Sequence, residues 1–192
     1  MKKTALFFGS FNPIHIGHLI IAEFIVERSD VDDLWFVISP SNPLKKQESL
    51  LHAQQRYYMT QVAIEDDPRF KTCDIEFKLP YPSYTAVTLV KLTELYPERE
   101  FIIIMGEDNL ENLHKWKNYE FILENFKIYV YPRLKHSGGN LWTHPHVHRV
   151  YAPIIEISAT MIREAIKTGK KVDYLLPAKV KQYIEEMGVY RK

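Results

Sequence analysis

Two histidines three residues apart are the first residues in this chain whose types and spacing could do chemistry. His15 and His18 lie in the segment Gly9-Ser10-Phe11-Asn12-Pro13-Ile14-His15-Ile16-Gly17-His18. Where a helix begins, residues three apart share one side, so both imidazoles can face a single ligand. The free N–H groups and the positive dipole end of a helix start attract anions. Two imidazoles would add hydrogen-bond donors there, so the segment predicts a site for phosphate oxygens.

Short apolar runs alternate with helical patterns on both sides of this segment. The runs predict strands at Thr4–Phe8, Leu34–Ser39, Phe70–Ile75, Phe101–Met105, Phe126–Tyr131 and Arg149–Ala152. The helical patterns lie at Gly17–Ser29, Leu51–Asp66, Ser83–Leu95, Ser158–Thr168 and from Pro177 onward. Ser83 and Ser158 are the expected N-caps of their helices. This alternation, joined by right-handed crossovers, favours a doubly wound, mostly parallel, Rossmann-like α/β sheet with helices on both faces.

Two of the expected strands end in glycine followed by polar residues. Thr4–Phe8 leads into Gly9-Ser10, and Phe101–Met105 leads into Gly106-Glu107-Asp108. Doubly wound sheets bind ligands at the carboxyl ends of their strands, where the strand order reverses. If these two strands are neighbours at that point, both turns face one pocket, which is where we expect the functional site.

Composition excludes several classes of protein. The 192 residues suffice for one domain spanning 1–192, whose C-terminal helical part begins at about residue 158. Lys plus Arg is 25 and Asp plus Glu is 24, so no basic surface points to nucleic acid or to a membrane. The single cysteine, Cys73, allows no intramolecular disulfide. No apolar run approaches the ~20 residues of a membrane span, so we expect a cytoplasmic protein without nucleic-acid or membrane partners.

The commonest nucleotide and hydrolase motifs are absent from the chain, including G-x-G-x-x-G, G-x-x-x-x-G-K-[ST], H-E-x-x-H and G-x-S-x-G. His144, His146 and His148 alternate, so a strand would place all three on one face. No carboxylate or cysteine lies close to them in the sequence. We therefore interpret them as a polar loop leading into a strand, and expect no protein-bound metal.

The segment His15-Ile16-Gly17-His18 matches the H-x-G-H signature of the nucleotidyltransferase superfamily, and the wider chain resembles bacterial nicotinate-nucleotide adenylyltransferases nearly end to end. The other motifs that carry the resemblance are Ser83-Tyr84-Thr85 with Thr88-Leu89, Met105-Gly106-Glu107-Asp108-Asn109-Leu110 with Trp116, Tyr131-Pro132-Arg133, Ile157-Ser158-Ala159-Thr160-Met161-Ile162-Arg163 and Tyr174-Leu175-Leu176-Pro177. Class I aminoacyl-tRNA synthetases share H-x-G-H, so the specificity comes from the combination of motifs.

This resemblance implies transfer of the adenylyl group of ATP to nicotinate mononucleotide, a step of NAD biosynthesis that gives deamido-NAD and pyrophosphate. The nucleophile is an anionic phosphate oxygen, so alignment and charge stabilisation suffice without a general base. The implied catalytic residues are His15, His18, Arg163 and Lys45, and neighbouring Lys46 could replace Lys45. The implied ATP-binding residues are Gly9, Ser10, Phe11, Gly106, Asp108, Ile157, Ser158 and Thr160. Mg²⁺ is expected to arrive with ATP.

The resemblance also assigns nicotinate mononucleotide to Tyr84, Thr85, Trp116 and Arg133. Trp116 would stack on the pyridine ring, while Tyr84 and Thr85 would donate hydrogen bonds to its carboxylate. Without the resemblance, Trp116 would be read as a packing residue, the commoner role of tryptophan. The 12 tyrosines and 10 phenylalanines would suit a homo-oligomer interface, although core packing explains them equally well.

Three alternatives remain open at this stage. A sibling transferase could use nicotinamide mononucleotide or phosphopantetheine in the same chemistry. A class I synthetase fragment would carry a K-M-S-K-S-like loop, which the chain lacks. A non-catalytic nucleotide-binding relative would have lost the histidine pair or Arg163, and all three residues are present.

Overall fold

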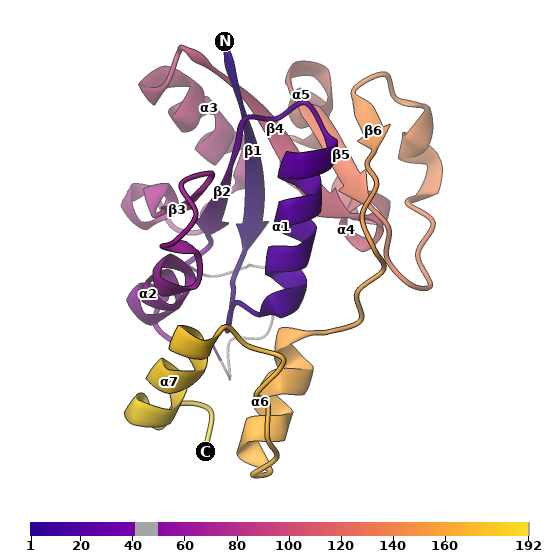
Figure 1. Cartoon of the computed structure of the whole chain (residues 1–192). Helices are drawn as coiled ribbons and strands as arrows, with labels where there is room; N and C mark the ends of the chain where they lie inside the picture. Colours follow the sequence, from indigo (N-terminus) through magenta and orange to yellow (C-terminus); the bar gives the residue numbers. More distant parts are fainter. Residues whose placement is uncertain (41–49, 192) are drawn as a thin grey trace.

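Six parallel strands form the central sheet of the computed structural model, which describes residues 1–40 and 50–191 (Figure 1). The strands are β1 (Lys2–Gly9), β2 (Asp33–Ile38), β3 (Phe70–Cys73), β4 (Arg99–Gly106), β5 (Lys127–Tyr131) and β6 (Val147–Arg149). Their order is β3-β2-β1-β4-β5-β6, and every pairing is parallel. The predicted doubly wound, Rossmann-like sheet is confirmed.

Helices cover both faces of this sheet because the apolar side chains of each inner strand alternate between them. In β1, Ala5 and Phe7 pack into one hydrophobic core and Leu6 packs into the other. The first core includes side chains of α1 (Ile16–Arg28), α2 (Ala53–Ile64), α6 (Ala159–Lys167) and α7 (Ala178–Met187). The second includes side chains of α3 (Thr85–Leu95), α4 (Glu107–Glu111) and α5 (Tyr119–Asn125).

The strand order reverses at β1, which pairs with β2 on one side and with β4 on the other. Phe7 of β1 lies opposite Ile104 of β4, so Gly9 and Gly106 end neighbouring strands. The two turns predicted to share a pocket are therefore adjacent. Figure 1 shows that α6 and α7 lie beyond the carboxyl ends of β1 and β2, next to this edge of the sheet.

Most predicted elements are present with ends within two residues of the prediction, whereas the last strand and one N-cap are wrong. The last strand is β6, Val147–Arg149, rather than Arg149–Ala152, because Val147 supplies the buried residue that pairs with Ile128. Phe70–Ile75 ends at Cys73, and the chain then forms η1, a 3-10 helix at Ile75–Lys78.

Ser83 is also not the N-cap that the sequence predicts. Helix α3 begins at Thr85 after Tyr84, and the Ser83 hydroxyl instead donates to the Glu76 carboxylate. Ser158, in contrast, caps α6 as expected by accepting a hydrogen bond from the Met161 N–H. Five short elements were not predicted: α4, α5, η1, and the 3-10 helices η2 (Leu113–Lys115) and η3 (Gly139–Thr143).

Candidate functional site

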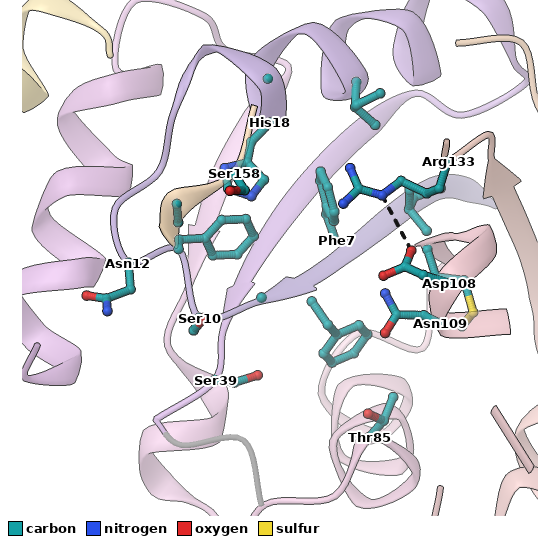
Figure 2. A pocket seen from close by; sticks show the side chains of 18 of the residues that line it. Phe7, Ser10, Asn12, His18, Ser39, Thr85, Asp108, Asn109, Arg133 and Ser158 are labelled. Atoms are coloured by element: carbon teal, nitrogen blue, oxygen red, sulfur yellow. Dashed lines mark ion pairs between the residues drawn. The ribbon is translucent and has the colours of Figure 1, made fainter. Parts of the chain in front are cut away.

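One cavity of about 680 Å³ opens at the carboxyl ends of β1 and β4 (Figure 2), which is within the size range of small-molecule sites. Almost every predicted site residue lines it: Gly9, Ser10, Phe11, His15, His18, Tyr84, Thr85, Asp108, Trp116, Arg133, Ile157, Ser158, Thr160 and Arg163. Gly106 lies just behind the wall, where a Cβ would collide with Asp108 Oδ1. Lys45 and Lys46 lie outside the described residues.

The two histidines of the first loop stack on each other. Their ring centroids are 3.7 Å apart with an interplanar angle of 24°, and the His15 N–H donates to His18 Nδ1 at 3.3 Å. A Cβ at Gly17 would lie 2.9 Å from Ile155 Cγ2 and 3.1 Å from the His15 ring. The glycine between the histidines is therefore required for this close packing.

His15 is buried, with 4% of its surface exposed. Burial, followed by the positive charge of Arg133, lowers the pKa of His15 to about 4. The ring is thus neutral at physiological pH. Its Nδ1 atom is buried and has no hydrogen-bond partner within residues 1–40 and 50–191, so a bound ligand could satisfy it.

The turn after β1 is held by aromatic packing. Phe11 is buried and adopts a positive φ of 43°, and its ring meets the rings of His18 at 5.0 Å and Phe7 at 5.7 Å. Such a strained backbone persists only where its surroundings hold it in place. A Cβ at Gly9 would lie 2.7 Å from the Phe11 ring, so this turn needs a glycine.

Helix α6 faces this turn with its N-terminus. Ser158 and Thr160 lie at that end, and Arg163 Nη1 donates to the Asn12 carbonyl at 2.9 Å. Arg163 Nη2 lies 3.3 Å from the Thr160 hydroxyl, to which it donates. The positive end of the helix and a guanidinium therefore lie beside the two histidines, and together these groups suit an anionic ligand.

Two buried polar residues that sequence reasoning missed support the turn from behind. Asn12 Oδ1 accepts from the Leu51 N–H at 3.3 Å and from the Tyr190 hydroxyl at 2.7 Å. The second residue, Arg56, is fully buried in α2. The two contacts of Asn12 could not be read from the sequence, because Leu51 and Tyr190 lie 39 and 178 positions away from it.

Arg56 donates only to main-chain carbonyls in the contacts that the structure describes. These belong to Ser10 at 2.5 Å, Ser39 at 2.8 Å, Pro40 at 2.7 Å and Leu51 at 2.9 Å. Burial lowers the pKa of Arg56 to about 10, so the guanidinium stays charged at neutral pH. The side chain ties the turn after β1 to the end of β2.

Asp108 and Arg133 lie on the β4 side of the cavity, where Figure 2 shows them facing each other. Arg133 Nε is 3.6 Å from Asp108 Oδ1, and Arg133 Nη1 donates to the Ile155 carbonyl at 3.2 Å. Asp108 Oδ1 is buried and accepts no hydrogen bond from the described residues. A buried acceptor of this kind fits a hydroxyl donor from a ligand.

Tyr84, Thr85 and Trp116 form the opposite end of the cavity. Thr85 begins α3, so its N–H has no partner within the helix. Trp116 follows η2 and lines the cavity, and Lys117 Nζ lies 4.5 Å from the centre of the Tyr84 ring. In Figure 2, Thr85 lies far from His18 and Ser158.

Glu76 is a third residue that sequence reasoning missed. It lines the cavity from η1 with 4% of its surface exposed. Its carboxylate accepts from the hydroxyls of Ser83 at 2.8 Å and Thr88 at 2.9 Å. Burial raises the pKa of Glu76, while bonds from Ser83, Thr88 and Ser39 act in the opposite direction. No motif in the sequence marks it.

No cluster of three or more His, Cys, Asp or Glu side chains suited to a metal occurs in the described part of the chain. His146 Nδ1 is 2.7 Å from the Leu123 carbonyl oxygen, and the His148 ring packs on Tyr129. His144 and His146 precede β6 and His148 lies within it, which agrees with a polar loop leading into a strand.

No helix among residues 1–40 and 50–191 has the length and apolarity needed to cross a bilayer.

A doubly wound sheet with a polar cavity at the reversal of strand order, backed by a histidine pair and a helix N-terminus, defines a nucleotide-binding α/β protein. Comparison with known proteins agrees with this class. The chain belongs to the cytidylyltransferase-like family, whose model matches residues 6–165.

Its relatives cover the whole chain. A protein of Flavobacterium johnsoniae is 55% identical over 192 residues, covering 99% of this chain and all of the relative. One from Flavobacterium psychrophilum is 53% identical with the same coverage. Both are named nicotinate-nucleotide adenylyltransferases. The resemblance predicted from the motifs is confirmed.

A solved structure shares the fold. The Plasmodium falciparum nicotinic acid mononucleotide adenylyltransferase, complexed with NaAD, has a TM-score of 0.83 and 18% sequence identity. The match covers 99% of this chain and 98% of that one. At this identity the likeness concerns the fold alone.

Proposed function

We propose that this protein is an enzyme that transfers the adenylyl group of ATP to nicotinate mononucleotide and releases pyrophosphate. The product is nicotinate adenine dinucleotide, so the reaction belongs to NAD biosynthesis. The observation that carries the proposal is a single cavity with two different ends. His15, His18 and Arg163 line it near the turn after β1, and Tyr84 with Trp116 lines it near Thr85, which lies away from His18 (Figure 2). Its relatives' names give the same activity.

The phosphate end supplies donors and positive charge. The attacking phosphate oxygen of the mononucleotide is already anionic, so this end needs only to align it with the α-phosphorus and to stabilise developing charge. His15 is neutral, because its pKa is about 4, and therefore acts as a hydrogen-bonding group rather than a cation. The positive charge comes from Arg163 and the N-terminus of α6, which we assign to the leaving pyrophosphate.

We assign the nucleoside parts of the two substrates to the rest of the cavity, around Asp108 and around Trp116. Asp108 Oδ1 lacks a hydrogen-bond partner in the described residues and is assigned to a ribose hydroxyl. Arg133 lies beside it, 3.6 Å away. Trp116 offers an aromatic face for the pyridine ring, and the α3 N-terminus at Tyr84 and Thr85 offers N–H groups for the pyridine carboxylate.

Mg²⁺ is assigned to the phosphates of ATP rather than to a resident protein site. The described residues hold no ligand cluster for a metal, and Asp108 is already beside Arg133. No step of the mechanism above depends on a metal-binding side chain. A cytoplasmic location, a homo-oligomer and the role of Lys45 stay predictions.

Pyrophosphate release from ATP tests the proposal, with nicotinate mononucleotide and nicotinamide mononucleotide compared in parallel. We expect release to be much faster with the acid. Equal rates, or a preference for the amide, would keep the adenylyl transfer and overturn the assignment of the pyridine substrate. No release with either substrate would contradict the enzyme and favour a non-catalytic nucleotide-binding protein.

A further inference from the structure

Glu76 is a buried carboxyl group that the mechanism above does not use. It belongs to η1, whereas the hydroxyls that donate to it belong to the segment leading into α3 and to α3 itself. Ser83 binds one carboxylate oxygen at 2.8 Å, and Thr88 binds the other at 2.9 Å. Both oxygens of one side chain thus connect two separate elements of the cavity wall.

These two hydroxyls lie on either side of the residues assigned to the pyridine carboxylate. Ser83 precedes Tyr84 and Thr85, and Thr88 follows them within the first turn of α3. The Thr88 hydroxyl also lies 3.3 Å from the Tyr84 carbonyl. Each hydroxyl donates to a different oxygen of Glu76, so one carboxyl group sets the direction of both hydroxyls. Anchoring at both sides holds the backbone between them.

We propose that Glu76 is the positioning residue of the pyridine subsite, where it orients the N–H groups of Tyr84 and Thr85 toward the nicotinate carboxylate through Ser83 and Thr88. This inference rests on the proposed function. Glu76 acts on ground-state binding of one substrate, because its hydrogen bonds come from Ser83, Thr88 and Ser39 and not from His15, His18 or Arg163. Burial is the larger effect and raises the pKa of Glu76, although the bonds from Ser83, Thr88 and Ser39 act against it.

The variant Glu76→Ala removes the shared acceptor and leaves the buried Thr88 hydroxyl and the partly buried Ser83 hydroxyl without it. We expect the KM for nicotinate mononucleotide to rise about tenfold, because loose donors lose alignment with the substrate carboxylate. The KM for ATP and kcat should each stay within about twofold of the wild type. Glu76→Gln keeps the side-chain volume and one carbonyl acceptor, so it should restore part of the affinity.

Thr93, in the same helix α3, offers a matched control for Thr88. The hydroxyls of Thr88 and Thr93 both lie against the carbonyl four residues earlier, but only Thr88 also binds Glu76. Thr88→Val should therefore raise the same KM as Glu76→Ala, and Thr93→Val should not. The double variant of Glu76 and Thr88 should be no worse than Glu76→Ala alone, since Glu76→Ala already removes the bond from Thr88.

Direct titration of nicotinate mononucleotide without ATP, followed by calorimetry, gives a readout that is independent of turnover. Weaker binding in Glu76→Ala and Thr88→Val, with unchanged binding in Thr93→Val, is the expected result. Equal KM values for nicotinate mononucleotide in all variants would overturn the inference, as would equal rises for both substrates. If the wild-type protein neither binds nor uses this mononucleotide, the proposed function fails first and the inference fails with it.

Discussion

The two ends of the cavity are built differently. At the phosphate end, His15 and Arg56 are almost fully buried, and Arg163 is bonded directly to the turn after β1. At the pyridine end, Tyr84 and Trp116 are only partly buried and expose part of their rings. The turn at the phosphate end is thus buried and hydrogen-bonded, whereas the pyridine end, where Glu76 accepts bonds from both sides of the Tyr84–Thr85 backbone, keeps aromatic surface open.

This difference matches the two tasks of the proposed reaction. Charge stabilisation at a reacting phosphate depends on donors that need no reorganisation, and a buried, cross-linked turn provides them. Recognition of a flat pyridine ring depends on accessible aromatic area and a few aligned donors. The comparison predicts that substitutions at the phosphate end lower kcat, whereas those at the pyridine end raise the KM of one substrate.

His18→Ala should have the largest effect. Loss of this ring removes one donor from the reacting phosphates and the stacking partner of His15. We expect kcat to fall about 10² to 10³-fold while the KM for nicotinate mononucleotide changes little. Steady-state pyrophosphate release measures both values. His148→Ala, which changes an exposed histidine in β6, is the control, and a near-normal kcat in His18→Ala would contradict the comparison.

The buried state of His15 predicts a pH dependence of stability. Its pKa is about 4 in the folded protein, against 6.5 ordinarily, so the unfolded chain binds the extra proton between these values. The free energy of unfolding should therefore fall as the pH drops from 6.5 to about 4, and this group contributes about 3 kcal/mol to the loss. Above pH 6.5 the His15 ring is neutral in both the folded and the unfolded chain, so this loss of stability is absent there.

Denaturant unfolding at several pH values, compared between the wild type and His15→Gln, isolates this contribution. Other groups titrate alike in both proteins, so the difference between the two curves reports His15 alone. The stability of His15→Gln should decline less across this range. Parallel curves would mean that the ring is solvated or charged in the folded state, which would contradict its burial at the phosphate end.

The sequence predicts the site best where the functional residues follow one another along the chain. Residues 9–18 contain the turn, the histidine pair and the helix start, so their types and spacing predict a phosphate site directly. The alternation of apolar runs and helical patterns likewise predicts the doubly wound sheet, since buried strands and amphipathic helices differ in period. The strand at Arg149–Ala152 was misplaced because Val147 lies among histidines and arginine, where an apolar pattern is too short to fix a register.

The residues that were missed act at long range. Arg56 and Glu76 are charged residues in ordinary-looking segments, and nothing local shows that they become buried. Their contacts depend on which strand ends the fold brings together, as with the carbonyls of Ser10 and Ser39 around Arg56. Composition and periodicity describe which faces are apolar, but they do not specify which polar group a buried charge will meet.

Trp116→Ala should have the smallest of these effects and should change the kinetics of one substrate only. The indole lines the cavity at the end away from the histidines, so its loss removes stacking area for the pyridine ring without disturbing the phosphate end. We expect the KM for nicotinate mononucleotide to rise about tenfold, with the KM for ATP and kcat nearly unchanged. Trp116→Phe, which keeps an aromatic face, should recover most of the affinity.

Trp142 provides the control because its indole packs under the Arg149 guanidinium and does not line the cavity. Trp142→Phe should leave all three kinetic values unchanged. If Trp116→Ala instead lowered kcat at saturating substrate, the ring would contribute to the transition state as well as to binding. The two ends of the cavity would then act as one unit, because a pyridine nucleotide held loosely at its ring would present a misaligned phosphate to His15 and His18.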